Sequence, residues 1–446
     1  MLHETQKAGQ TPIAVGTTTV PPYTKVDAKI PIITVNIFFD GTRNNLYNSA
    51  VHRADKTKDG IANAVEIASN TSHQNYFSNI ALLYLVQYMD VPNVYKIYVE
   101  GSGSARYKSD DWEGLGFAVG STGRTTRVNA AFRALEQIKN ETGRDYSSFE
   151  INVFGFSRGA AWARHFCYRI KNSWGKLKNA KINFVGIMDT VSSDGGAHYD
   201  DVKEMGLDIG KKKEGINRIV HLTAQNEYRE HFPLTRIPCA VEEGIGFECS
   251  LPGAHSDIGG GYSEDYPENK VIKPLNPFGD YIDFEWFITK GYYFQHQTNP
   301  PVPGQRVYGK RNTKFHYQFI CFEIMKDISS QQCKYKIVDQ YSKIPYRAMK
   351  RLREHLDYMK QEDILGTYFM SCYSYILSKY RNVGLDFRVP NSSNENMRYI
   401  YNHYIHNSID YGDKANEAGT SFKDASKGGE PKRTLVTDGY KYGNLS

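Results

Sequence analysis

The chain alternates short continuous apolar runs with segments whose apolar residues recur at helical spacing. The continuous runs predict buried strands over residues 32–39, 94–101, 149–155, 181–189, 217–224 and 244–250. Between them, the spacing predicts helices over residues 75–89, 127–140 and 158–171. Strands that are apolar throughout are typical of a parallel sheet covered on both faces by helices. The pattern therefore predicts an α/β fold with a mainly parallel sheet over residues 31–262.

The pattern changes after Tyr262. Residues 264–312 are rich in proline, glycine, asparagine and aromatic side chains, and helical spacing returns at 344–360 and 365–380. We therefore expect a mostly helical region over 263–411, either a lid or membrane-docking surface over the core or an ordinary appendage. The ends of the chain are polar, which predicts a flexible arm over 1–30 and a polar tail over 412–446.

Composition narrows the classes of protein to consider. Net charge is +6 over 446 residues, without a long basic cluster, so we expect no nucleic-acid groove. The six cysteines are scattered without a C-x-x-C pair, which argues against a disulfide framework or a zinc site. The N-terminus lacks the pattern of a signal peptide, and no run of about 18 apolar residues is present. We expect synthesis in the cytoplasm and no membrane-spanning helix.

The segment GFSRG, residues 155–159, follows a predicted strand and precedes a predicted helix. A serine at this place can simply cap the helix. In α/β-hydrolases, however, G-x-S-x-G forms the turn that presents a nucleophilic serine, and its glycines permit the tight bend. The strand–turn–helix context favours Ser157 as a nucleophile.

A serine nucleophile needs a base to take its proton and a carboxylate to orient that base. In α/β-hydrolases the acid follows the serine along the chain, at the carboxyl end of a strand. Asp189 ends its predicted strand and fits this role, although an aspartate there can also cap a turn. Asp194, Asp200 and Asp201 lie further into the loop and are weaker rivals.

The base should follow the last core strand. His255 lies there, in a glycine-rich loop, and His406 is the rival. We expect His165, in the helix after Ser157, and His221, inside a strand, to pack in the core. For Asp257 we weigh a metal ligand, a residue that orients the loop, and a turn-forming aspartate.

An oxyanion hole requires two backbone N–H groups aimed at the developing charge. One should come from Arg158, which follows the serine, and the other from a loop after an early strand. Gly41 and Thr42 lie in such a loop, and we expect Asp40 to fix its conformation. This scheme requires no metal and no cofactor.

Two motifs of other protein classes, a phosphatase motif and a phosphate-binding loop, lack residues that they require. IFFDGT, residues 37–42, is similar to the first motif of haloacid-dehalogenase-type phosphatases, but Phe38 stands where the phosphorylated aspartate belongs. The glycine-rich segment 101–124 lacks the G-x-x-x-x-G-K-[ST] pattern of a P-loop. We expect this segment to form a loop at the rim of the active site.

Four segments together resemble the first family of type VI secretion lipase effectors. They are FFDGTRNN (38–45), GFSRGAAWARHF (155–166), FVGIMDTV (184–191) and PGAHSDIGGGY (252–262). The resemblance covers 31–262 and implies an α/β-hydrolase-like fold with a Ser157–Asp189–His255 triad that acts on phospholipids. Met188 stands where the family often has tryptophan before the acid. The resemblance also implies delivery by a type VI spike or tube protein, action in the target cell's periplasm or membrane, and a cognate immunity protein.

Two alternatives to a phospholipase remain at this point. One is a soluble esterase for another substrate class, and the other is a non-catalytic binding module on a hydrolase fold. A phospholipase must reach a bilayer, where aromatic and basic side chains suit the interface. We expect the aromatic stretch 284–294 and the helices 344–360 and 365–380 to supply that surface.

Overall fold

The computed structural model describes most of the chain. The described residues are 5–7, 31–53, 72–88, 92–172, 175–194, 202, 205–210, 215–273, 284–299, 305–333, 336–337, 347–380, 386–388, 395–409, 433 and 435–436. The expected N-terminal arm and C-terminal tail lie outside them, apart from residues 5–7, 433 and 435–436.

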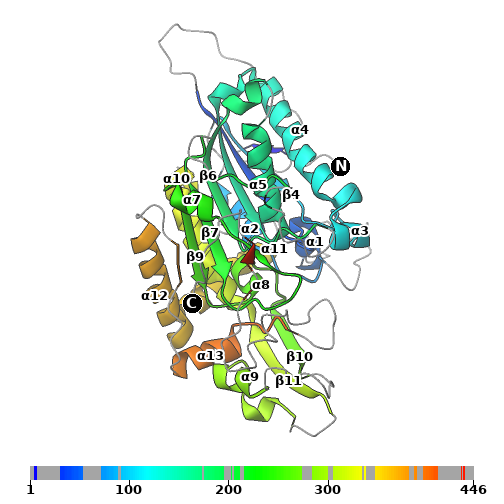
Figure 1. Cartoon of the computed structure of the whole chain (residues 1–446), viewed down its shortest axis with the longest axis vertical. Helices are drawn as coiled ribbons and strands as arrows, with labels where there is room; N and C mark the ends of the chain where they lie inside the picture. The colour runs from blue at the N-terminus through cyan, green and yellow to red at the C-terminus, as the bar shows by residue number, and fades with distance from the viewer. Residues whose placement is uncertain are drawn as a thin grey trace.

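A central eight-stranded sheet organises the molecule, in the order β1-β4-β2-β5-β6-β7-β9-β13 (Figure 1). Its strands are β1 (Thr5–Lys7), β2 (Ile33–Phe39), β4 (Val94–Val99), β5 (Phe149–Phe156), β6 (Lys181–Met188), β7 (Ile219–Ala224), β9 (Gly246–Leu251) and β13 (Asp386–Arg388). Every neighbouring pair is parallel except β1 with β4. The predicted α/β fold with a mainly parallel sheet is confirmed, and each of the six predicted strands is present.

Helices cover both faces of this sheet (Figure 1). Helices α4 (Arg124–Thr142) and α5 (Arg158–Lys171) share a buried cluster with Val35, Ile37 and other side chains from one face. Helices α2 (Asn79–Val86) and α10 (Gln318–Cys333) share a second cluster with Phe38 and others from the opposite face. Successive strand side chains point to opposite faces, so these strands are buried on both sides. Each such side chain contributes about 1.5–3 kcal/mol to folding.

The remaining elements surround this core. The helices are α1 (Leu46–Arg53), α3 (Trp112–Phe117), α7 (Pro238–Glu242), α8 (His255–Gly259), α9 (Phe284–Lys290), α11 (Arg347–Gln361), α12 (Asp363–Tyr380) and α13 (Glu395–His403). The short strands are β3 (Gln87–Tyr88), β8 (Leu234–Thr235), β10 (Asp265–Lys273), β11 (Val307–Lys314), β12 (Lys336–Ile337) and β14 (Leu435–Val436). The two helices expected after Tyr262 correspond to α11 and α12, so the mostly helical C-terminal region is confirmed.

The part of the chain after Tyr262 also contributes to the core. Helix α10 is buried along most of its length and packs against β6, α2 and α8. Strand β13 pairs with β9 at the edge of the central sheet. The change in composition at Tyr262 therefore does not separate two cores, because elements after it pack against elements before it.

Three aromatic side chains of the stretch 284–294 are not available to the expected membrane-docking surface. Phe287, Tyr292 and Tyr293 are buried, and the Trp286 ring packs on Phe287 and Tyr292. These rings pack beside the two-stranded β10–β11 sheet, so the docking prediction is wrong for them. Among the described residues, no helix combines the length and the apolar character needed to cross a bilayer.

Candidate active site

The turn between β5 and α5 holds Ser157 in a strained conformation. Its φ of 58° and ψ of −129° lie in a region that non-glycine residues rarely adopt. The backbone enforces this conformation, because Ser157 N–H donates to Met188 C=O at 3.0 Å and its C=O accepts from Ala160 N–H at 3.0 Å. The Ser157 side chain makes no capping hydrogen bond to α5. Ser157 thus occupies the N-cap position of α5, but its side chain does not cap the helix.

The two glycines of this turn are required by close approach. A Cβ on Gly155 would lie 2.6 Å from Ala160 Cα, inside the first turn of α5. A Cβ on Gly159 would lie 2.2 Å from the Asp40 carbonyl oxygen. Glycine at these positions lets the start of α5 press against both its own strand and the loop after β2.

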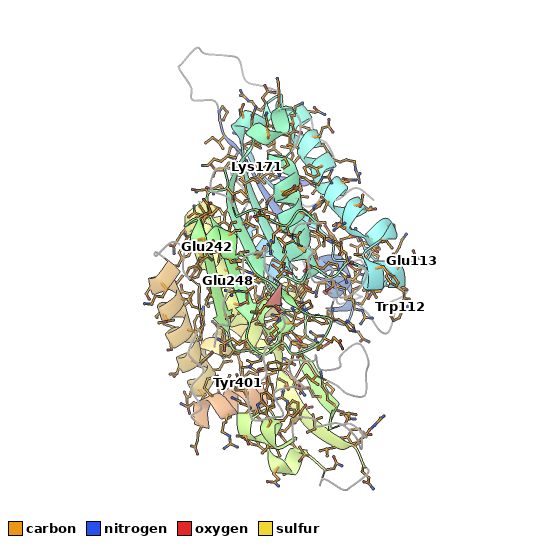
Figure 2. All side chains as sticks on the ribbon, viewed as in Figure 1. Trp112, Glu113, Lys171, Glu242, Glu248 and Tyr401 are labelled. Carbon is orange, nitrogen blue, oxygen red and sulfur yellow. The ribbon has the colours of Figure 1, made fainter. Side chains whose placement is uncertain are left out.

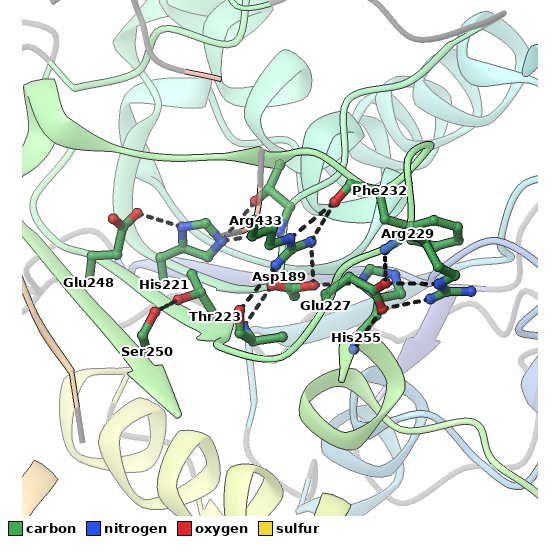
Figure 3. Close-up of polar contacts among 12 residues, drawn as sticks. Asp189, His221, Thr223, Glu227, Arg229, Phe232, Glu248, Ser250, His255 and Arg433 are labelled. Carbon is green, nitrogen blue, oxygen red and sulfur yellow. Dashed lines mark hydrogen bonds and ion pairs between the residues drawn. The ribbon is translucent and has the colours of Figure 1, made fainter. Parts of the chain in front are cut away.

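Asp189 directly follows β6, and its carboxylate is fully buried. Its Oδ2 accepts from His255 Nδ1 at 2.5 Å, and its Oδ1 accepts from Ala224 N–H at 2.8 Å (Figure 3). Burial alone would raise the pKa of Asp189, but the Arg433 guanidinium and the bond from His255 outweigh it and hold this pKa well below its ordinary value. Asp189 is therefore an ionised carboxylate that faces the imidazole.

His255 begins α8 and lies between two aromatic rings. The ring centroid of Phe156 is 4.7 Å from that of His255, and the centroid of Phe232 is 5.1 Å away. The His255 backbone N–H donates to Glu227 Oε2 at 3.2 Å. Burial lowers the pKa of His255, although Asp189 opposes this shift. The imidazole is thus neutral near pH 7, as a proton acceptor must be.

The topology brings the three predicted residues to one edge of the sheet. Ser157, Asp189 and His255 follow the carboxyl ends of β5, β6 and β9, and these strands are all parallel. Phe156, which precedes Ser157, contacts the His255 ring. The three residues therefore lie at the same edge of the sheet, where His255 and Asp189 are hydrogen-bonded to each other.

The rival histidines are engaged elsewhere. The rival base, His406, donates through Nδ1 to Asp257 at 2.6 Å and stacks on Tyr262. His165 and His221 are bound to other groups in the core, as expected.

The rival aspartates do not contact His255 in the same way. Asp194 forms ion pairs with Arg124 at 3.1 Å and with Arg158 at 3.6 Å. Asp200 and Asp201 lie outside the described residues. Asp189 is thus the described aspartate that holds the imidazole of His255.

Asp257 orients the loop that carries His255. Its Oδ2 accepts from the backbone N–H groups of Ala254 at 2.9 Å and His406 at 3.0 Å, and its Oδ1 binds the His406 ring. These contacts fit the loop-orienting alternative. Within the described part of the chain, no group of three or more potential metal ligands is assembled.

The loop after β2 is fixed by Asp40, which is fully buried. Its carboxylate accepts from Ser78 Oγ at 2.6 Å, Tyr98 Oη at 2.5 Å and Gly41 N–H at 2.8 Å. Burial raises the pKa of Asp40 to about 6 in spite of these bonds. The contact engages the Gly41 N–H, so the expectation that Gly41 lines an oxyanion hole is corrected. Thr42 is the remaining candidate in this loop.

The side chain of Arg158 has a role that the sequence did not reveal. Its Nε donates to Ser193 C=O at 2.8 Å, and its Nη1 donates to Leu115 C=O at 2.8 Å and Ser102 Oγ at 3.2 Å. It therefore joins the start of α5 to the loop after β6 and to the segment 101–124. These contacts support the predicted position of that segment at the rim of the site.

Three charged residues beside His255 and Asp189 were also missed. Glu227 is fully buried behind His255, and Arg229 binds its two oxygens at 2.9 Å each. Arg433 Nη1 lies 2.5 Å from Asp189 Oδ1, and its Nη2 lies 2.9 Å from Asp189 Oδ2. The position of Glu227 just after β7 was a usable signal. Arg433 offered none, because it lies 244 residues from its partner.

Part of the chain matches the model of a known protein family. Residues 167–277 match a family model described as "T6SS, Phospholipase effector Tle1-like, catalytic domain". This confirms the resemblance inferred from the sequence. The matched segment contains Asp189 and His255, while Ser157 lies just before it. No curated protein matches the chain.

One solved structure shares the fold. "Structure of the Tle1 effector bound to the VgrG spike from the Type 6 secretion system" aligns over 98% of this chain and 99% of that chain, with a TM-score of 0.52 and 18% identity. An uncharacterized protein from Pseudomonas aeruginosa aligns over 77% of this chain and 50% of its own, with a TM-score of 0.41 and 15% identity, a likeness too low to support an argument.

Proposed function

Starting from the match to Tle1-like phospholipase effectors, we propose that this chain is a serine phospholipase. It hydrolyses carboxyl esters of membrane phospholipids with Ser157 as nucleophile, His255 as base and Asp189 as the orienting acid. The observation that carries the proposal is a serine on a strained turn beside a buried histidine–aspartate pair. Strain of this kind concentrates at functional sites.

The reaction follows from the roles of these side chains. Ser157 Oγ attacks the ester carbonyl while His255 Nε2 takes its proton, and Asp189 stabilises the resulting imidazolium. The N–H groups of Arg158 and Thr42 receive the developing oxyanion. The intermediate collapses to an acyl-serine, and His255 gives its proton to the departing alcohol. Water then attacks the acyl-serine with His255 again as base, which releases the fatty acid.

Exposed apolar side chains at the rim support action at a lipid surface. Trp112 is 75% exposed, Phe117 61% and Val119 51%. They lie on and just after α3, whose Leu115 carbonyl is bound by the Arg158 side chain. Figure 2 places Trp112 at the outer edge of the molecule. Tryptophan and phenylalanine suit the membrane interface, so this rim is the proposed contact with the bilayer.

Delivery is proposed from the comparison with the effector that was solved on its VgrG spike. In this proposal the chain is carried by a type VI spike or tube protein and acts on the periplasmic membrane surface of a target bacterium. The producing cell then needs a cognate immunity protein.

The test is hydrolysis of phospholipid vesicles by the wild type beside Ser157→Ala. The wild type should release fatty acid, and the variant should lose about three or more decades of rate, because triad members act as a unit. Hydrolysis of short-chain esters without hydrolysis of vesicles would favour a soluble esterase. Vesicle binding without turnover of either substrate would favour a binding module.

A further inference from the structure

Arg433 enters the active site from a part of the sequence far beyond the three triad residues. Its guanidinium forms two hydrogen bonds with the Asp189 carboxylate, one to each oxygen (Figure 3). Only 5% of the Arg433 side chain and none of the Asp189 side chain is exposed. A planar guanidinium that binds both oxygens fixes the plane of a carboxylate as well as its charge.

The same side chain is anchored on the neighbouring loop. Arg433 Nε and Nη2 each donate to the Phe232 carbonyl at 3.0 Å. The Phe232 ring packs against the His255 imidazole. Arg433 therefore contacts the acid directly and, through the Phe232 backbone, the residue that packs against the base.

A short strand follows Arg433 and adds a backbone attachment. Strand β14 pairs in parallel with β8, with Leu435 opposite Leu234 and Val436 opposite Thr235. Thr235 N–H in turn donates to the Thr190 carbonyl at 2.9 Å, and Thr190 directly follows Asp189. Figure 1 shows β14 as a short red arrow. The segment is thus attached to the Asp189 loop through both its side chain and its backbone.

The charge balance gives Arg433 a role in the resting enzyme. A buried carboxylate without a cation is costly, and the resting His255 supplies only a neutral N–H. Arg433 is the cation that compensates Asp189 until the imidazolium forms. It also restricts the carboxylate to the orientation in which Oδ2 faces His255 Nδ1.

We propose that Arg433 is a positioning residue for the Ser157–His255–Asp189 reaction, so that Arg433, held beside the site by β14, completes the active site. This inference rests on the proposed function. It assigns to the C-terminal segment a task that no feature of the sequence indicated.

The test compares Arg433→Gln and Arg433→Lys with the wild type on a soluble short-chain ester. Arg433→Gln should lower kcat by about 10- to 100-fold and leave KM nearly unchanged. This is the size of effect that follows when a residue that orients a metal ligand is replaced. Loss of a nearby cation raises the pKa of an imidazole, so the acid limb of the pH–rate profile should move to higher pH. Arg433→Lys should restore the acid limb and recover only part of kcat, because an ammonium lacks the bidentate fork.

A matched control is Arg311→Gln. Arg311 is also buried and pairs with Glu268 at 2.7 Å, but it lies outside the triad. Loss of this pair should lower the melting temperature and leave the acid limb in place. If Arg433→Gln behaves like this control, with an unchanged acid limb and near wild-type kcat, Arg433 only supports the fold and the inference is wrong. If Arg433→Gln does not fold, the kcat of Arg433→Lys decides.

Labelling of Ser157 by a fluorophosphonate separates this inference from the proposed substrate. A wild type that labels at Ser157 but ignores phospholipid removes the phospholipase proposal, and slower labelling of the Arg433 variants still supports positioning. A wild type that neither labels nor hydrolyses esters overturns both, because there is then no serine reaction for Arg433 to support.

Discussion

At the scale of single residues, burial and nearby charges determine which side chains of the site carry a proton. Asp189 is held ionised by Arg433 and His255, while burial keeps His255 neutral. Asp40, which lies in an uncompensated buried site, has its pKa raised to about 6. The two aspartates thus differ because one faces a guanidinium and an imidazole and the other faces hydroxyl groups.

The pH dependence of the reaction should reflect the environment of His255. Only the neutral imidazole accepts the serine proton, and burial lowers the pKa of His255. A lower pKa means that the neutral form persists to lower pH. The acid limb of kcat/KM on a soluble ester should therefore have its midpoint below about 6.5, the ordinary value for histidine. A midpoint above that value contradicts this description of the base.

Replacement of the acid tests the carboxylate directly. Asp189→Asn should lower kcat by about four decades, because the amide cannot hold the productive tautomer. It also leaves Arg433 unpaired, which should lower the free energy of unfolding by about 3–5 kcal/mol. Activity and urea denaturation measure the two effects.

The control for this replacement is Asp194→Asn, since Asp194 pairs with Arg124 and Arg158 at the rim. It should retain most activity. An inactive Asp194→Asn beside an active Asp189→Asn transfers the acid role to Asp194.

At the scale of elements, the pattern of apolar positions determined which strands and helices could be predicted from the sequence. The six core strands were found because each is buried on both faces and reads as a continuous apolar run. Strand β11 was missed, although its alternation of buried and exposed positions from Val307 to Lys314 is typical of a half-buried strand. Helix α10 is buried around most of its circumference, including its polar residues Glu323 and Lys326, so it lacks the exposed polar stripe that marks a surface helix.

The site was predictable to the same extent as its elements. Ser157, Asp189 and His255 were predicted as site residues because each follows a recognisable strand. Arg433 and the Arg158 side-chain contacts were not, since they depend on which distant loops the fold brings together. The engagement of Gly41 N–H by Asp40 depends on a side-chain rotamer that no sequence pattern specifies.

The turn between β5 and α5 offers a test at this scale. Gly159→Ala would place a methyl group 2.2 Å from the Asp40 carbonyl, so α5 and the loop after β2 must separate. We expect a lower melting temperature and a loss of activity of at least about tenfold, since small displacements in an active site are costly. The control is Gly116→Ala, whose added methyl meets no atom within 4 Å. Equal behaviour of the two variants contradicts the close-packing explanation.

At the scale of the whole molecule, the Arg158 side chain links the proposed active site to the exposed apolar rim on and after α3. The α3 segment carries Trp112 and Phe117 outward and binds the Arg158 side chain inward. Phe287, Tyr292 and Tyr293, from the aromatic stretch that the sequence favoured for docking, are instead buried beside the two-stranded β10–β11 sheet. The lipid-facing surface is therefore proposed on the N-terminal half of the chain.

A double variant tests this surface. Trp112→Ala with Phe117→Ala should reduce vesicle hydrolysis by roughly tenfold, because two interfacial side chains are lost. Turnover of a soluble short-chain ester should stay near the wild-type rate. The matched control, Trp286→Ala with Phe287→Ala, should lower stability and both activities together, since Phe287 is buried. Equal loss on both substrates in the rim variant contradicts a docking role.

The most direct test of the central claim is covalent labelling by a fluorophosphonate, followed by intact mass measurement and peptide mapping. The proposed mechanism predicts one adduct at Ser157 in the wild type, an adduct in His406→Ala at a similar rate, and labelling slowed by about three decades in His255→Ala. Fast labelling of His255→Ala, or an adduct on a residue other than Ser157, would contradict it.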